Sequence, residues 1–207
     1  MNPVQASASF QQAQYGTFRL TDAIRPSPRH PIIPQEGYRL ETFRDEEQGL
    51  TIPVLAASVS REKLFDCFLD LIGQLDDVVD VILETSHDGT DNHRDLSREE
   101  IDLPVLQSHL FEYEDLLLND GCTGIAVLCC SQPIEIQFDE HKLLYVYAED
   151  PEPFKEVMQE YGICLKDDLQ LITEGEHLHN SAPHHLDQFE QMCFRLGVGE
   201  MAEHVNW

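Results

Sequence analysis

Apolar residues along this chain recur with two periods, one typical of strands and one typical of helices. Ile134, Ile136 and Phe138 alternate with polar residues, which predicts a half-buried strand. The apolar run at residues 143–147 predicts a strand inside a sheet. Apolar side chains three and four positions apart over residues 154–161 predict one face of a helix. The central stretch is therefore expected to form strand, turn, strand and helix.

The same two periods predict the other elements of the chain. Ser97 to Glu100 have the spacing of a capping box, which predicts a helix start just before the helix that contains Pro104. Pro53 lies inside an apolar run and predicts an edge strand or an irregularity there. The remaining strands are expected at 38–44, 50–59, 78–83, 124–130 and 169–173, and the remaining helices after Ser60, from Pro104 towards Gly121, and at 184–196.

Strands that form hairpins before passing into helices predict an α+β fold, with a mixed or antiparallel sheet covered by amphipathic helices. The two halves of the chain also resemble each other. Leu40–Glu46 parallels Ile134–Glu140, and in each half an apolar strand and an amphipathic helix follow. We therefore consider an internal duplication of a ββαβα unit, with pseudo-equivalent halves at 38–121 and 122–197.

The first 36 residues differ in character from the rest. Prolines recur within 26–34, and this spacing favours extended backbone. Residues 1–40 carry four arginines against two acids, whereas the remainder carries a net charge of −28. We expect a flexible, proline-containing arm at residues 1–36 and an α+β domain at 37–207. The arm either lies across the acidic body or is a loose leader.

Charge and cysteine content restrict the classes of partner and compartment. The formal net charge of −26 disfavours nucleic acid as a partner, because phosphates would be repelled, and favours basic proteins or self-association, for example as a homodimer. The chain has no apolar run long enough to span a membrane and no signal peptide at its start. Six cysteines without a C-x-x-C pair are typical of reduced thiols, so we expect a cytoplasmic protein.

Histidines near carboxylates are the best candidates for chemistry. Glu84-x-x-His87 and Glu174-x-x-His177 occupy matching places in the two halves, each near the end of a predicted strand. Imidazole together with carboxylate suits zinc, iron or manganese. The candidate ligands of such a metal are His87, His93, Glu174, His177, His179 and His184.

The spacing of these residues separates the candidates. Residues three apart on a strand point to opposite sides, whereas His177 and His179 share one face and could chelate together. The alternative is that all of these histidines lie in solvated loops. The charged turn at 139–142, which includes His141, is expected to be a solvated hairpin turn. Cys129 and Cys130 lie in an apolar strand and are expected to be buried, structural cysteines.

The sequence contains no phosphate-binding glycine loop and no nucleophile elbow. We therefore expect a non-catalytic binding or regulatory protein that acts through its acidic surface and needs no cofactor. The alternative is a metal-dependent enzyme resembling a hydrolase, in which a divalent ion activates water and Glu174 or Glu176 acts as base. A pocket that gathers the histidines would favour the enzyme.

Overall fold

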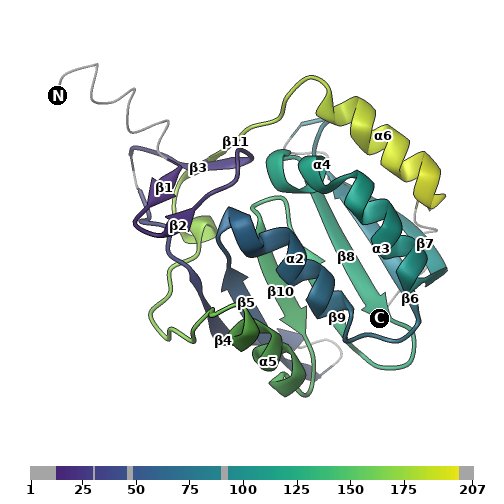
Figure 1. The fold of residues 1–207 in the computed structure, drawn as a ribbon, viewed down its shortest axis with the longest axis horizontal. Helices are drawn as coiled ribbons and strands as arrows, with labels where there is room; N and C mark the ends of the chain where they lie inside the picture. Colours follow the sequence, from purple (N-terminus) through teal and green to yellow (C-terminus); the bar gives the residue numbers. More distant parts are fainter. Residues whose placement is uncertain (1–12, 30, 46–48, 90–92, 201–207) are drawn as a thin grey trace.

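The computed structural model describes residues 13–29, 31–45, 49–89 and 93–200. An eight-stranded antiparallel sheet forms its centre, with the strand order β12-β7-β6-β8-β9-β10-β5-β4 (Figure 1). The predicted α+β class and antiparallel sheet are confirmed. The strands of this sheet are β4 (Gly37–Asp45), β5 (Leu50–Ser58), β6 (Val78–Thr85), β7 (Arg94–Asp102), β8 (Thr123–Cys129), β9 (Glu135–Phe138), β10 (Leu143–Tyr147) and β12 (Gly199–Glu200).

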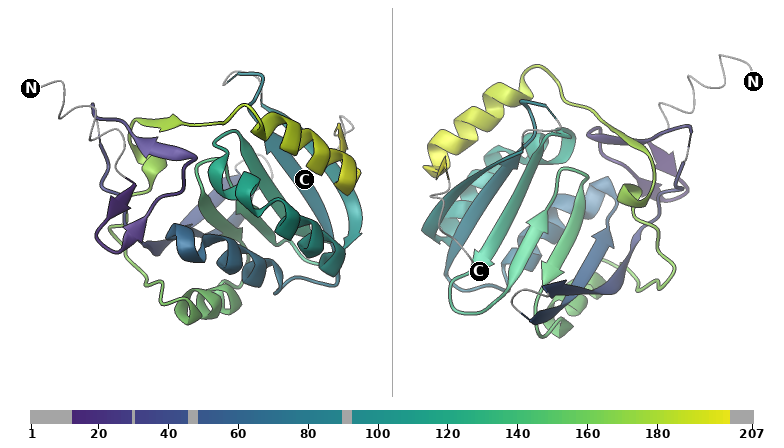
Figure 2. Two further views of the ribbon diagram at one scale, coloured as in Figure 1. Left: turned by 45° about the horizontal axis from the view of Figure 1, so that its top comes forward. Right: turned by 180° about the vertical axis from the view of Figure 1, so that it is seen from behind.

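Helices α2 to α6 lie on one face of the sheet. In the view from behind, no helix of the described residues covers the opposite face (Figure 2). Every second side chain of β6, β9 and β10 enters the core between sheet and helices, whereas β8 is buried along its whole length. Phe68 of a helix and Phe138 of β9 meet there edge to face, with ring centroids 5.3 Å apart. The helices are α2 (Arg61–Ile72), α3 (Leu103–Glu112), α4 (Glu114–Asn119), α5 (Glu152–Glu160) and α6 (His185–Leu196).

A second, smaller core joins the N-terminal segment to the sheet. Within residues 13–29, this segment contains β1 (Gln14–Tyr15), β2 (Phe18–Arg19) and β3 (Ile24–Pro26). Strand β3 pairs in antiparallel fashion with β11 (His177–His179), which lies far away in the sequence (Figure 2). The apolar residues of this core are Phe18, Leu20, Ile24, Ala56, Leu143, Leu169, Leu171 and Ile172.

Two predicted elements are wrong. Ser97 does not cap a helix: it lies within β7, where it pairs with Ile82 of β6, because cross-strand pairing overrides the local capping pattern. Residues 169–173 do not form a strand. Ile172–Glu174 form a single 3₁₀ turn, in which the Glu174 carboxylate accepts a hydrogen bond from the Leu171 N–H at 3.2 Å. The internal duplication remains a prediction.

Among the described residues, no helix combines the length and the apolar character needed to cross a membrane.

Candidate metal centre

The turn between β9 and β10 places His141 in a fixed position. The Asp139 carboxylate accepts a hydrogen bond from the Leu143 N–H at 2.8 Å through one oxygen. Its other oxygen lies 2.9 Å from Nδ1 of His141. Lys142 closes the turn with a φ of 62°, a conformation that is costly for a residue other than glycine. The turn is therefore held by its own side chains and is not a loose solvated loop.

Strand β11 supplies two further imidazoles from one face. His177 and His179 are both half-buried, whereas Leu178 between them points outward. The Nδ1 atom of His177 lies 2.8 Å from the Gly175 carbonyl oxygen. The Nδ1 atom of His179 lies 2.5 Å from the carbonyl oxygen of Gly121. Pairing of β11 with β3 fixes the direction in which these two side chains point.

The three imidazoles converge on one another. Ring centroids lie 4.9 Å apart for His141 and His177, 4.8 Å for His141 and His179, and 5.2 Å for His177 and His179. One ligand atom from each ring lies within 4.8 Å of those of the other two. We define His141, His177 and His179 as the three-histidine site.

Hydrogen bonding selects the nitrogen that each ring can offer to a ligand. A carbonyl or carboxylate oxygen can only accept, so Nδ1 of each ring must carry the proton. Nε2 of each ring then keeps its lone pair. Metal-binding histidines in proteins are commonly oriented in this way, by a carboxylate or a backbone carbonyl on the other nitrogen. The three rings need only close to about 3.4 Å between nitrogens to hold zinc tetrahedrally at about 2.0–2.1 Å.

Neighbouring charges act differently on the three imidazoles. Burial by itself lowers the pKa of His141, but the hydrogen bond and the charge of Asp139 outweigh it and raise that pKa. Burial lowers the pKa of His179, against the opposing effect of the Gly121 carbonyl, and the neighbouring His141 and His177 lower it further. The carboxylate of Glu140 favours the positive charge on both His141 and His179. A metal cation at this site would take the place of the second proton that His141 and His179 bind when they are positively charged.

A buried lysine lies beside the site. Lys142 is 5% exposed, and its Nζ donates a hydrogen bond to the Thr123 carbonyl oxygen at 2.8 Å. Burial lowers the pKa of Lys142 to about 8. His141 and Lys142 also line a small, partly open cavity of about 10 Å³, which has room for about one water molecule.

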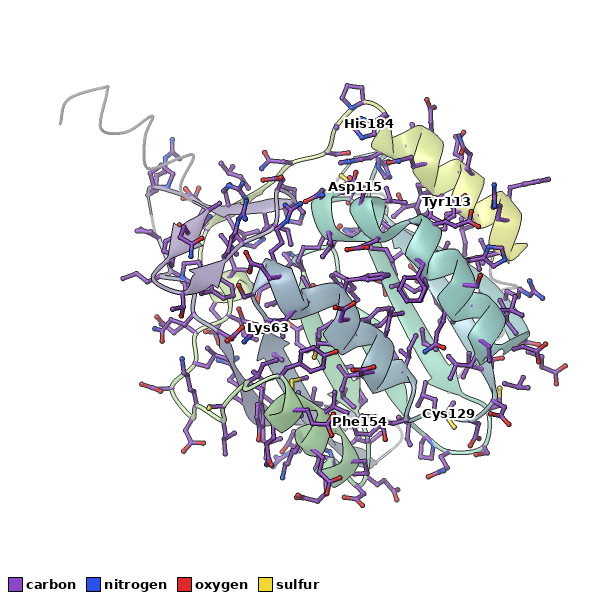
Figure 3. All side chains as sticks on the ribbon, viewed as in Figure 1. Lys63, Tyr113, Asp115, Cys129, Phe154 and His184 are labelled. Carbon is purple, nitrogen blue, oxygen red and sulfur yellow. The ribbon has the colours of Figure 1, made fainter. Side chains whose placement is uncertain are left out.

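The other predicted site residues lie elsewhere. The Glu174 carboxylate forms an ion pair with Arg39 at 2.6 Å and does not face the three-histidine site. His93 is exposed and immediately precedes β7 in the chain. His184 lies beside Asp115 and His185, near the start of α6 (Figure 3). His87 belongs to a separate, partly buried cluster with Asp120 and Cys122.

The structure thus unites His177 and His179, as their spacing predicted, and adds His141, which the sequence assigned to a solvated turn. The contact between the turn and β11 joins residues that are far apart in the chain, so no local pattern marks it. Comparison with protein-family models, with curated proteins and with solved structures finds no match, so the functional argument rests on this geometry.

Proposed function

We propose that this protein binds a divalent transition metal ion through His141, His177 and His179. The observation that carries the proposal is that all three imidazoles have Nδ1 anchored by an acceptor while the rings converge. Three neutral imidazoles suit zinc, and also copper, iron and nickel, better than calcium or magnesium, which prefer oxygen ligands. Zinc is the probe of choice because it keeps one oxidation state and accepts a tetrahedral set.

The site supports a binding role in which the ion fastens two parts of the molecule together. His141 belongs to the central sheet, whereas His177 and His179 belong to the two-stranded β3–β11 ribbon. An ion held by all three would link the ribbon to the sheet. The formal charge of −26 favours accumulation of cations around the protein.

The direct test is metal analysis and zinc titration calorimetry of the untagged, chelator-treated protein. We expect His177→Ala and His141→Ala each to lose one tightly bound equivalent relative to the unmodified chain. His93→Ala is the matched control, because His93 is an exposed histidine outside the site. Equal stoichiometry and affinity in all four proteins would contradict the proposal.

A metal-dependent hydrolase is the second candidate, favoured by the number of ligands. Three protein ligands leave a tetrahedral ion one position for water, as in catalytic zinc sites. Glu140, whose charge acts on both His141 and His179, would serve as the base. The cavity lined by His141 has a volume of about 10 Å³, which is too small for an organic substrate and favours the binding role. Zinc-dependent hydrolysis of 4-nitrophenyl acetate that is lost in Glu140→Gln, with zinc affinity unchanged, would favour the enzyme instead.

A further inference from the structure

A second cluster of side chains that could bind a metal ion lies between the end of β6 and the start of β8. Asp120 at its centre is completely buried. Its carboxylate accepts hydrogen bonds from Thr123 Oγ1 at 2.5 Å and from the Cys122 N–H at 3.3 Å. These donors, together with the Ser181 side chain, fix the orientation of the carboxylate.

His87 points an unsatisfied nitrogen at this carboxylate. Its side chain is only 7% exposed, and its Nδ1 atom lies 2.7 Å from Thr85 Oγ1. Its Nε2 atom is buried and makes no hydrogen bond, although it lies 3.1 Å from Oδ2 of Asp120, because the two groups are poorly aligned. The His87 imidazole nevertheless helps to keep the Asp120 carboxylate ionised, and at this separation either a proton or a metal ion can lie between the nitrogen and the oxygen. A cation between the nitrogen and the carboxylate would satisfy both.

Cys122 adds a sulfur donor to the same place. One ligand atom from each of His87, Asp120 and Cys122 lies within 4.8 Å of the others. Among these three donors, the thiol is the soft one, and a nitrogen, oxygen and sulfur set suits zinc. His185 is excluded from the set, because its Nδ1 atom already accepts a hydrogen bond from the Ala182 N–H at 3.0 Å.

We propose that His87, Asp120 and Cys122 form a second transition-metal site, of the zinc class, in which Cys122 binds as a thiolate. On binding, the thiol loses its proton to solvent and the sulfur forms a bond to the ion. Because the thiol must lose its proton to bind, metal binding at this site weakens as the pH falls. The second site stands on its own residues and does not depend on the three-histidine site.

The two sites share one loop. Gly121 lies between Asp120 and Cys122, and its carbonyl oxygen holds Nδ1 of His179. A Cβ atom at Gly121 would lie 2.5 Å from the Ala23 carbonyl oxygen and 3.0 Å from the Asn180 backbone, so only glycine fits there. An ion held by Asp120 and Cys122 would therefore fix the carbonyl that orients a ligand of the first site.

Cobalt(II) substitution of the full-length, reduced protein tests this inference, because a thiolate ligand gives a charge-transfer band in the near ultraviolet and histidine ligands do not. We expect the unmodified protein to bind two equivalents and to show this band. Cys122→Ser should lose one equivalent and the band. His177→Ala should lose one equivalent and keep the band. Cys130→Ser, which alters an exposed cysteine, is the matched control and should change neither.

Absence of the band from the unmodified protein, or its persistence in Cys122→Ser, would overturn the second site. Retention of both equivalents by His177→Ala would instead overturn the three-histidine site, so the two failures are distinguishable. X-ray absorption at the zinc edge covers the case in which a variant does not fold. In the unmodified, zinc-loaded protein it should detect a sulfur neighbour at about 2.3 Å, and a spectrum with nitrogen and oxygen neighbours alone would refute the site.

Discussion

At the scale of single residues, the candidate site depends on groups that hold other groups in place. Asp139 shows this most clearly, because one of its oxygens closes the turn while the other orients His141. The carbonyl oxygens of Gly175 and Gly121 do the same for the two histidines of β11. Residues that do not touch the ion should therefore still control its affinity.

The first prediction concerns Asp139→Asn, which keeps the shape of the side chain and removes its charge. We expect zinc affinity at the three-histidine site to fall roughly 10–100-fold, the range seen when such supporting groups are removed. The pKa of His141 should also fall, because the Asp139 carboxylate raises it. Calorimetry and an NMR titration of the histidine rings measure the two effects. Asp168→Asn, at an exposed aspartate, should leave both unchanged.

The second prediction concerns Glu84, on the sheet face opposite the helices. Burial, together with the charges of Asp95, Asp139, Glu135 and Glu140, raises the pKa of Glu84 from 4.5 to about 7. The folded state thus holds a proton on Glu84 that the unfolded state releases above about pH 4.5. The unmodified protein should therefore lose stability from this group as the pH rises from about 4.5 through about 7.

Glu84→Gln removes this loss, because glutamine is neutral at every pH. The variant should gain stability over the unmodified chain as the pH rises, with a plateau of roughly 1 kcal/mol above pH 7 after allowance for partial exposure. Denaturant unfolding at a series of pH values measures the difference. Glu156→Gln, at an exposed glutamate, is the control and should show no such trend. A constant difference between Glu84→Gln and the unmodified chain would contradict the assignment.

At the scale of elements, most strands and helices follow from local periodicity. The hairpin β9–β10 and helix α5 lie where alternation and helical spacing predicted them. The pairing of β3 with β11 could not be predicted from the sequence, because two three-residue strands about 150 positions apart leave no local pattern. The spacing of His177 and His179 predicted their shared face, whereas the approach of His141 depends on that unpredicted pairing. The sequence therefore predicted the two histidines on β11, but it did not predict that His141 of the β9–β10 turn approaches them.

The third prediction links the β3–β11 ribbon to metal binding. Ile24 of β3 is completely buried in the smaller core, and it pairs directly with His179. Ile24→Ala should lower the free energy of unfolding by about 2–4 kcal/mol and weaken zinc binding, because the ribbon packs less firmly. Ile33→Ala, at an isoleucine that is 68% exposed, is the control. Destabilisation without any change in zinc affinity would show that the ribbon does not position the ligands.

At the scale of the whole molecule, net charge and metal binding act together. Thirty-nine acidic residues against 13 basic ones give a formal net charge of −26. This charge attracts cations to the protein surface, and the acidic side chains repel one another in the folded state. The sheet face without helices includes Glu84 among several carboxylates, and burial together with these charges raises the pKa of Glu84. Binding to basic protein partners and self-association remain predictions, and they were made from the sequence and its negative charge.

The fourth prediction follows from this repulsion. Screening of like charges should raise the Tm of the chelator-treated protein by a few degrees as ionic strength increases from about 0.01 to about 0.15 M, over which the Debye length falls from about 30 to about 8 Å. Differential scanning calorimetry measures the shift. Sodium chloride and potassium chloride should act equally, because screening depends on ionic strength. A lower Tm at the higher salt concentration would show that attractive ion pairs outweigh the repulsion.

The three-histidine site is the claim on which the other functional statements depend, and a crystal structure of the zinc-soaked protein with anomalous data at the zinc edge tests it most directly. We expect an anomalous peak in contact with Nε2 of His141, His177 and His179. Zinc peaks confined to other positions, with these three rings as far apart as they are without metal, would contradict the proposed site.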